Sequence, residues 1–108
     1  MTWTTRREGT RFIAEGVGEE TLTFPWGREV FRERVRHEVD TERPAHAAAL
    51  GVAETVIELE GRTLRLDTEI TVTSDRDRFH TEVHRRLTEN DRVIRDRTWS
   101  EDHPRDHH

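Results

Sequence analysis

The segment around His80 contains three side chains that could ligate a metal: His80, Glu82 and His84 alternate along it. Zinc takes its ligands at about 2 Å. The apolar positions around the histidines recur with a period of two, which predicts a strand, and residues i and i+4 of a strand lie about 13 Å apart. Because one strand cannot bring both histidines to one ion, we expect no native metal site and no other cofactor.

A second set of polar side chains interrupts the apolar side of three predicted strands. Glu33 and His37 are in phase with the apolar residues of their strand, and so are Arg85 and Arg97 in the last two strands. Burying an unpaired charge costs several kcal/mol. These groups must therefore pair with one another, sit in a wet interior or lie at a rim.

Two interpretations of this set remain open. In the first, the charged side chains form a structural Glu/Arg/His network. In the second, they line a pocket, where Arg85 and Arg97 present forked donors and Trp99, with Phe31 and Trp26, supplies apolar walls. Such a pocket suits a small molecule with a carboxylate or another polar head. The candidate ligand-binding residues are Glu33, His37, Arg85, Arg97 and Trp99.

The acid–base chemistry of such a pocket is limited to Glu33 and His37. They lie about 13 Å apart along one strand, so they cannot form a hydrogen-bonded dyad, although either could act alone on a bound ligand. The sequence contains no phosphate-binding loop, nucleophile elbow or telling pair of carboxylates. A noncatalytic protein is therefore favoured over an enzyme.

Composition predicts a thin core. The chain has 108 residues, 31% hydrophobic and 38% charged, which indicates one domain over residues 1–108 that needs help from a partner. We expect a homodimer or a tight complex with another chain. The net charge of −5 gives no electrostatic reason to bind nucleic acid or an anionic membrane. Cysteine is absent and no apolar run is long enough for a signal peptide or a membrane span, so a cytoplasmic location is expected.

The elements that position these residues are predicted to be strands joined by short turns. Alternation is clearest at Leu64–Val72, where one set of alternate positions holds Leu64, Leu66, Ile70 and Val72 and the other is polar. Pro25 marks Leu22–Trp26 as an edge or a strand end, and Gly16–Gly18 is expected to break the preceding strand. Thr41–Gly51 could be a short helix or a loop, and the tail 101–108 is expected to fray. The fold prediction is an all-β, antiparallel up-and-down meander of seven or eight strands, barrel-like or strongly curved.

The run from Asp40 to Asp106 resembles the β-rich C-terminal region of hydrolases of the CocE/NonD family. The matching segments are Gly61–Thr68, Thr73-Ser74-Asp75, Phe79-His80, Arg97-Thr98-Trp99 and His103-Pro104-Arg105. In that family the catalytic serine lies in a separate α/β-hydrolase domain. Neither Ser74 nor Ser100 has the Gly-x-Ser-x-Gly setting, so no catalytic residue is carried over.

The resemblance implies a noncatalytic accessory or small-molecule-binding β module, with a hydrolase chain as a possible partner. One alternative is a small β-barrel enzyme of isomerase or cyclase type that acts on a hydrophobic ligand with a polar head. Another is a purely structural homodimer.

Overall fold

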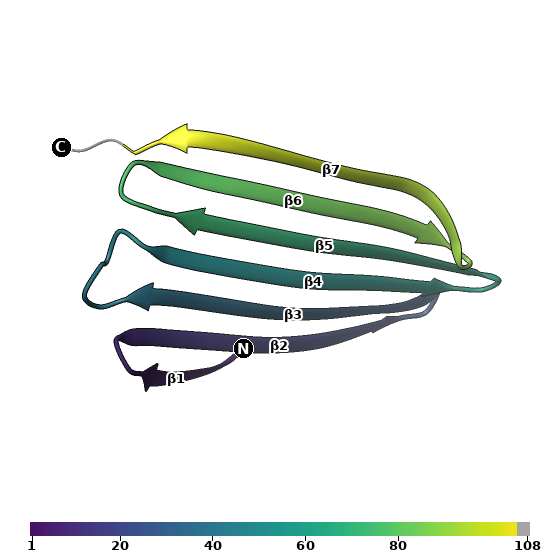
Figure 1. The fold of residues 1–108 in the computed structure, drawn as a ribbon. Helices are drawn as coiled ribbons and strands as arrows, with labels where there is room; N and C mark the ends of the chain where they lie inside the picture. The colour runs from purple at the N-terminus through teal and green to yellow at the C-terminus, as the bar shows by residue number, and fades with distance from the viewer. Residues whose placement is uncertain (106–108) are drawn as a thin grey trace.

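One antiparallel sheet contains every strand that the computed structural model shows (Figure 1). The structure describes residues 1–105, and the sheet order follows the chain from β1 to β7. The strands are β1 (Thr2–Glu8), β2 (Arg11–Phe24), β3 (Gly27–Asp40), β4 (Ala47–Leu59), β5 (Arg62–Ser74), β6 (Arg78–Glu89) and β7 (Arg92–Pro104). The predicted all-β meander is confirmed. The sheet is not closed into a barrel, because β1 and β7 do not pair with each other in the described chain.

Tight turns join the long strands where the sequence allows a positive φ. Gly9 ends the β1–β2 hairpin with φ 62° and Gly61 the β4–β5 hairpin with φ 70°. Between β6 and β7, Asn90 and Asp91 have φ 48° and 65°, as a two-residue primed turn requires. Asn90 also accepts a hydrogen bond from the Thr63 amide at 2.8 Å, so neighbouring turns are tied together.

Three local expectations are corrected by the structure. β2 runs unbroken through Gly16–Gly18. The possible helix at Thr41–Gly51 is absent, because the alanine-rich part of this segment belongs to β4 and pairs with β3 and β5 on its two sides. β7 continues to Pro104, inside the tail expected to fray; residues 106–108 lie outside the described residues.

The outer edge of the sheet is uneven near the N-terminus. β1 pairs with β2 only as far as Val17, so the rest of β2, Gly18–Phe24, has no second strand partner among residues 1–105. This agrees with the edge predicted at Leu22–Trp26. Pro25 lies in the β2–β3 turn, where its missing N–H costs no sheet hydrogen bond.

The sheet is a single layer with both faces uncovered in the described chain. Among residues 1–105, Ile13 is the only large side chain that is fully buried. The radius of gyration is 17.6 Å, against about 13 Å for a compact domain of this length. The accessible surface is 8159 Å², against about 6,300 Å² for a folded monomer of this mass. Since domains are normally built from at least two packed layers, this sheet lacks its second layer.

Candidate binding face

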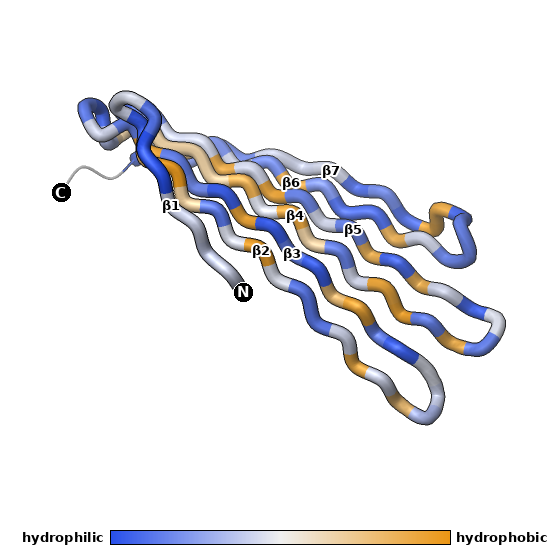
Figure 2. Tube along the Cα trace, turned by 90° about the horizontal axis from the view of Figure 1, so that it is seen from below, coloured by the Kyte–Doolittle hydropathy of each residue, from blue (hydrophilic) through white to orange (hydrophobic). Residues whose placement is uncertain are grey.

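Hydrophobic and hydrophilic residues alternate along the strands (Figure 2), and because successive side chains point to opposite sides, the sheet has two chemically different faces. The apolar face is defined by the cross-strand row Gly16, Val35, Gly51, Ile70, Val83 and Trp99 and by the residues in phase with it. The opposite surface, here the charged face, carries the residues between them, such as Arg32 and Glu54. All five residues predicted to bind a ligand are in phase with the apolar face: Glu33, His37, Arg85, Arg97 and Trp99.

Two of the predicted arginines meet beside the predicted tryptophan at one edge of the apolar face. Arg85 of β6 and Arg97 of β7 are direct cross-strand partners. The guanidinium carbon of Arg97 lies 5.1 Å from the centroid of the Trp99 ring. These three side chains line a depression of about 250 Å³, here called the arginine hollow, together with Leu66, Leu87 and Arg95.

The arginine hollow has unused hydrogen-bonding capacity. No carboxylate oxygen of residues 1–105 lies within 4.0 Å of the side-chain nitrogens of Arg85, Arg95 or Arg97. Guanidinium groups bind carboxylates and phosphates through two parallel N–H donors. The hollow can therefore receive an anionic group beside an apolar body.

Glu33 does not reach these arginines within one chain. It lies in the same cross-strand row as Arg85, but Ala53 of β4 and Thr68 of β5 stand between them. Three strand spacings correspond to about 14 Å. The Glu33 carboxylate instead leans over the adjacent Gly18, with Oε1 3.3 Å from the position that a Cβ of Gly18 would take. The predicted intramolecular Glu/Arg network is not formed between these residues.

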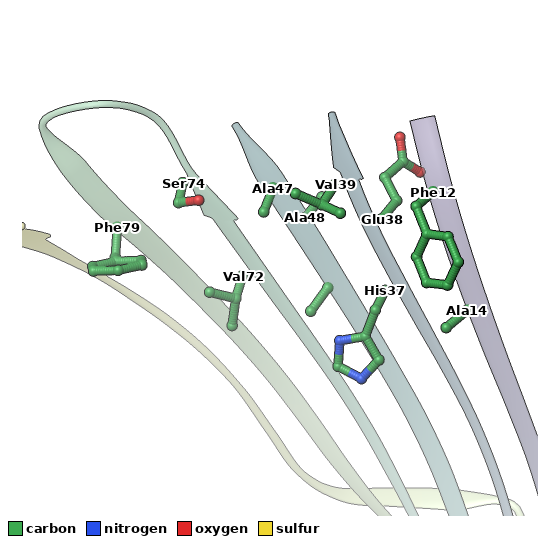
Figure 3. Close-up of a pocket in the computed structure, with 11 residues that line it drawn as sticks. Phe12, Ala14, His37, Glu38, Val39, Ala47, Ala48, Val72, Ser74 and Phe79 are labelled. Atoms are coloured by element: carbon green, nitrogen blue, oxygen red, sulfur yellow. The ribbon is translucent and has the colours of Figure 1, made fainter. Parts of the chain in front are cut away.

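His37 lies nearer the opposite end of the apolar face. Its ring stacks on Trp3, with centroids 6.1 Å apart and an interplanar angle of 24°. It also borders a second depression of about 260 Å³, between Phe12 of β2 and Phe79 of β6, whose floor is largely alanine (Figure 3). Trp26, expected as a pocket wall, lies instead in the β2–β3 turn and stacks on Phe24 at 4.6 Å. The five predicted residues therefore share a face but not one pocket.

The charged face is internally paired. Arg32 contacts Glu19 and Glu54 at 3.4 and 3.7 Å. An arc of ion pairs surrounds Ile13, in the order Arg6, Glu15, Arg36, Glu38 and Arg11. These exposed pairs contribute little each. Arg6 and Glu38 lie directly across from Ile13 in the sheet, and we attribute its burial to the aliphatic parts of these neighbouring side chains.

The histidines of β6 also have carboxylate partners on the charged face. His80 Nδ1 lies 2.6 Å from Asp102 and His84 Nε2 2.5 Å from Asp96. The contacts of His84 and Arg86 lower the pKa of Asp96 below its usual value. Residues 1–105 hold no group of three potential metal ligands. Sequence reasoning missed both aspartates, because only the cross-strand register reveals these pairs.

Asp75, which follows β5, and Asp40, the last residue of β3, are held by backbone amides. Asp75 accepts hydrogen bonds from the amides of Asp77 and Arg78 at 2.8 and 2.9 Å, and these bonds lower its pKa. The Asp40 carboxylate accepts from the Glu42 amide at 3.0 Å, with the same effect on its pKa. These groups are turn caps beside the strands, so their role is in the fold.

Comparison with known proteins adds no family to this description. The chain matches no family model, no curated protein and no solved structure. No residue among 1–105 is helical, so no helical membrane span is found there. Function must therefore be argued from the two faces of the sheet.

Proposed function

We propose that the protein is a noncatalytic accessory β module that docks its apolar face onto another protein surface. The observation that carries the proposal is the missing second layer, with an accessible surface of 8159 Å², about 1,900 Å² above that of a compact monomer. The proposal agrees with the resemblance to the C-terminal β region of CocE/NonD-family hydrolases. In that arrangement the partner packs on the apolar face and forms the second layer.

Charge pairing supports the choice of face. The charged face satisfies most of its ionic groups within the chain, whereas the apolar face combines exposed Leu66, Ile70 and Phe79 with arginines that have no carboxylate neighbour in the described chain. A surface of this composition is typical of a protein interface, where aromatic residues and arginine are enriched. The apolar face is therefore the docking face.

The test compares two apolar residues of equal exposure on opposite faces. Ile70 is 40% exposed on the apolar face, and Val52 is 41% exposed on the charged face beside Arg34. Light scattering is measured for wild type, Ile70→Glu and Val52→Glu, each alone and mixed with the catalytic domain of a CocE/NonD-type hydrolase. We expect wild type and Val52→Glu to form an assembly in one of these conditions and Ile70→Glu to form none. Monomers that stay cooperatively folded and bind no hydrolase domain would contradict the proposal.

A second candidate function is supported by the arginine hollow, which has the composition of a site for a small carboxylate with an apolar body. Calorimetric titration of wild type and Arg85→Met with aromatic and aliphatic carboxylates tests it. Saturable binding lost in Arg85→Met supports a small-molecule site. The isomerase or cyclase alternative has less support, since the open sheet encloses no barrel interior.

A further inference from the structure

We infer that the surface covering the apolar face is a second copy of this chain, packed face to face about a two-fold axis that runs along the strands between β4 and β5. This inference rests on the proposed docking function and adds the partner and its register. Such an axis stacks β4 on β5, β3 on β6 and β2 on β7 of the second copy. The operation leaves each residue at the same height along the strand direction. A residue at one end of a cross-strand row in one copy therefore lies over the residue at the other end of that row in the second copy.

Opposite charges meet under this operation. Glu33 of β3 and Arg85 of β6 occupy one row at equal distances from the axis, so Glu33 of one copy faces Arg85 of the other. In the next row, Glu20 of β2 faces Arg95 of β7 by the same symmetry. Within residues 1–105, neither glutamate lies within 4.0 Å of an arginine or histidine nitrogen.

The Glu33 carboxylate has a second counterpart. It leans over Gly18, which shares its row with Arg97. The axis brings Arg97 of the second copy onto Gly18, where the absent side chain leaves room for the carboxylate. Glu33 can then accept from both Arg85 and Arg97 of the second copy, and the arginine hollow is filled by a protein carboxylate.

Side-chain sizes are complementary about the same axis. In the middle of the sheet, β4 presents small residues to the apolar face where β5 presents larger ones. Gly51 shares its row with Ile70, and Ala49 shares its row with Val72. The two-fold operation therefore sets Ile70 over the space at Gly51, where an added Cβ would have no neighbour within 4 Å. Interdigitation of this kind is the packing rule of two aligned sheets about 10 Å apart.

The surplus accessible surface and the charge clashes expected for a different two-fold axis both support this arrangement. The surplus of about 1,900 Å² per chain lies within the range that obligate dimers bury on each partner. An axis across the strands would instead stack β3 on β3 and β6 on β6, bringing acidic strands onto acidic and basic onto basic. At one end, the chosen axis sets Glu29 near Glu89, and Glu89 already pairs with Arg62 at 3.2 Å.

Charge reversal with complementation tests the register. Glu33→Arg and Arg85→Glu are each expected to raise the dimer dissociation constant at least about 100-fold, because both symmetry-related contacts become repulsive. Mixing the two variants restores a heterodimer, since each reversed residue then faces its opposite. The matched control is Glu69→Arg: Glu69 lies on the charged face of β5, and its dimer should match wild type in sedimentation equilibrium.

Gly51→Val tests the face-to-face packing independently of the charges. Its side chain has open space in one chain and favours a strand, so the variant stays folded by circular dichroism while the second copy is displaced. If wild type is monomeric at 100 μM by light scattering, the inference of a dimer is overturned. The proposed docking function would still be supported if wild type bound the hydrolase domain and Ile70→Glu did not. Dimers that persist in Glu33→Arg, Arg85→Glu and Gly51→Val overturn the register. A dimer lost only in Ile70→Glu keeps the docking face and rejects this two-fold arrangement.

Discussion

Replacement of Ile13 by alanine should destabilise the sheet more than any other single truncation on the charged face. Ile13 has 0% relative exposure, although it lies on the more polar surface. It is covered by the arms of ion-paired residues on β1, β2 and β3, with Arg6 and Glu38 directly across from it in the sheet. Its burial therefore depends on three strands at once.

The size of the effect follows from how the site can relax. Truncation of a fully buried isoleucine to alanine costs about 2–5 kcal/mol, depending on how much of the cavity remains. Here the lid consists of arginine and glutamate side chains that are themselves partly exposed, such as Arg6 at 44%. Because flexible side chains can close part of the cavity, we expect a loss of about 2–3 kcal/mol in the free energy of unfolding.

Urea unfolding of Ile13→Ala and Val17→Ala, followed by circular dichroism at one protein concentration, measures this effect. Val17 is the control, because it lies on the same face of the same strand and is 52% exposed. Its truncation should cost less than about 0.5 kcal/mol. Equal midpoints for the two variants would show that the ion-paired arms do not shield Ile13, and the reasoning about the charged face would be wrong.

Three further outcomes are expected. Arg97→Met should change the unfolding free energy of dilute monomer by no more than about 1 kcal/mol, because Arg97 loses its contact with the Trp99 ring but has no carboxylate partner in the described chain, while light scattering shows loss of assembly. The lowered pKa of Asp75 stabilises the fold above its unfolded value of about 3.9, and this contribution disappears as the pH falls through the lower folded value. Urea midpoints from pH 2 to 6 should therefore show Asp75→Asn less stable than wild type at pH 6, with the difference vanishing in acid. Because the second copy binds only the folded chain, calorimetry should show the melting temperature of wild type rising about 3 °C per tenfold increase in protein concentration, whereas the melting temperature of Glu33→Arg, which does not assemble, should stay constant.

Alternation along single strands was enough to predict the fold class and the shared face of the candidate residues. Successive side chains of a strand point to opposite faces, so Arg85 shares a face with Val83 and Leu87 of its own strand, and Arg97 shares a face with Trp99 of the next strand. The short turns at Gly9, Gly61 and Asn90 require strands that follow one another in the chain to pair with each other. A meander follows from these local rules.

Contacts between distant strands could not be predicted in this way. The relation of Glu33 to Arg85 depends on three successive registers, and an error of one residue in any of them moves the pair to opposite faces. Alanine propensity favoured a helix before Gly51, but pairing on both sides of β4 outweighed it. Barrel closure depends on strand tilt and stagger, which alternation does not encode.

The unpaired charges on the apolar face restrict the partners that can cover it. A purely apolar surface would bury Arg85 and Glu33 without counter-charges, at a cost of several kcal/mol each. Any tight partner must therefore present a carboxylate over the arginine hollow and a cation about 14 Å away over Glu33, on a surface that fits the small residues of β4. A second copy of the chain meets these requirements with its own Glu33, Arg85 and Ile70. A hydrolase domain in place of the second copy would need a carboxylate and a cation at the same positions and a surface of complementary shape.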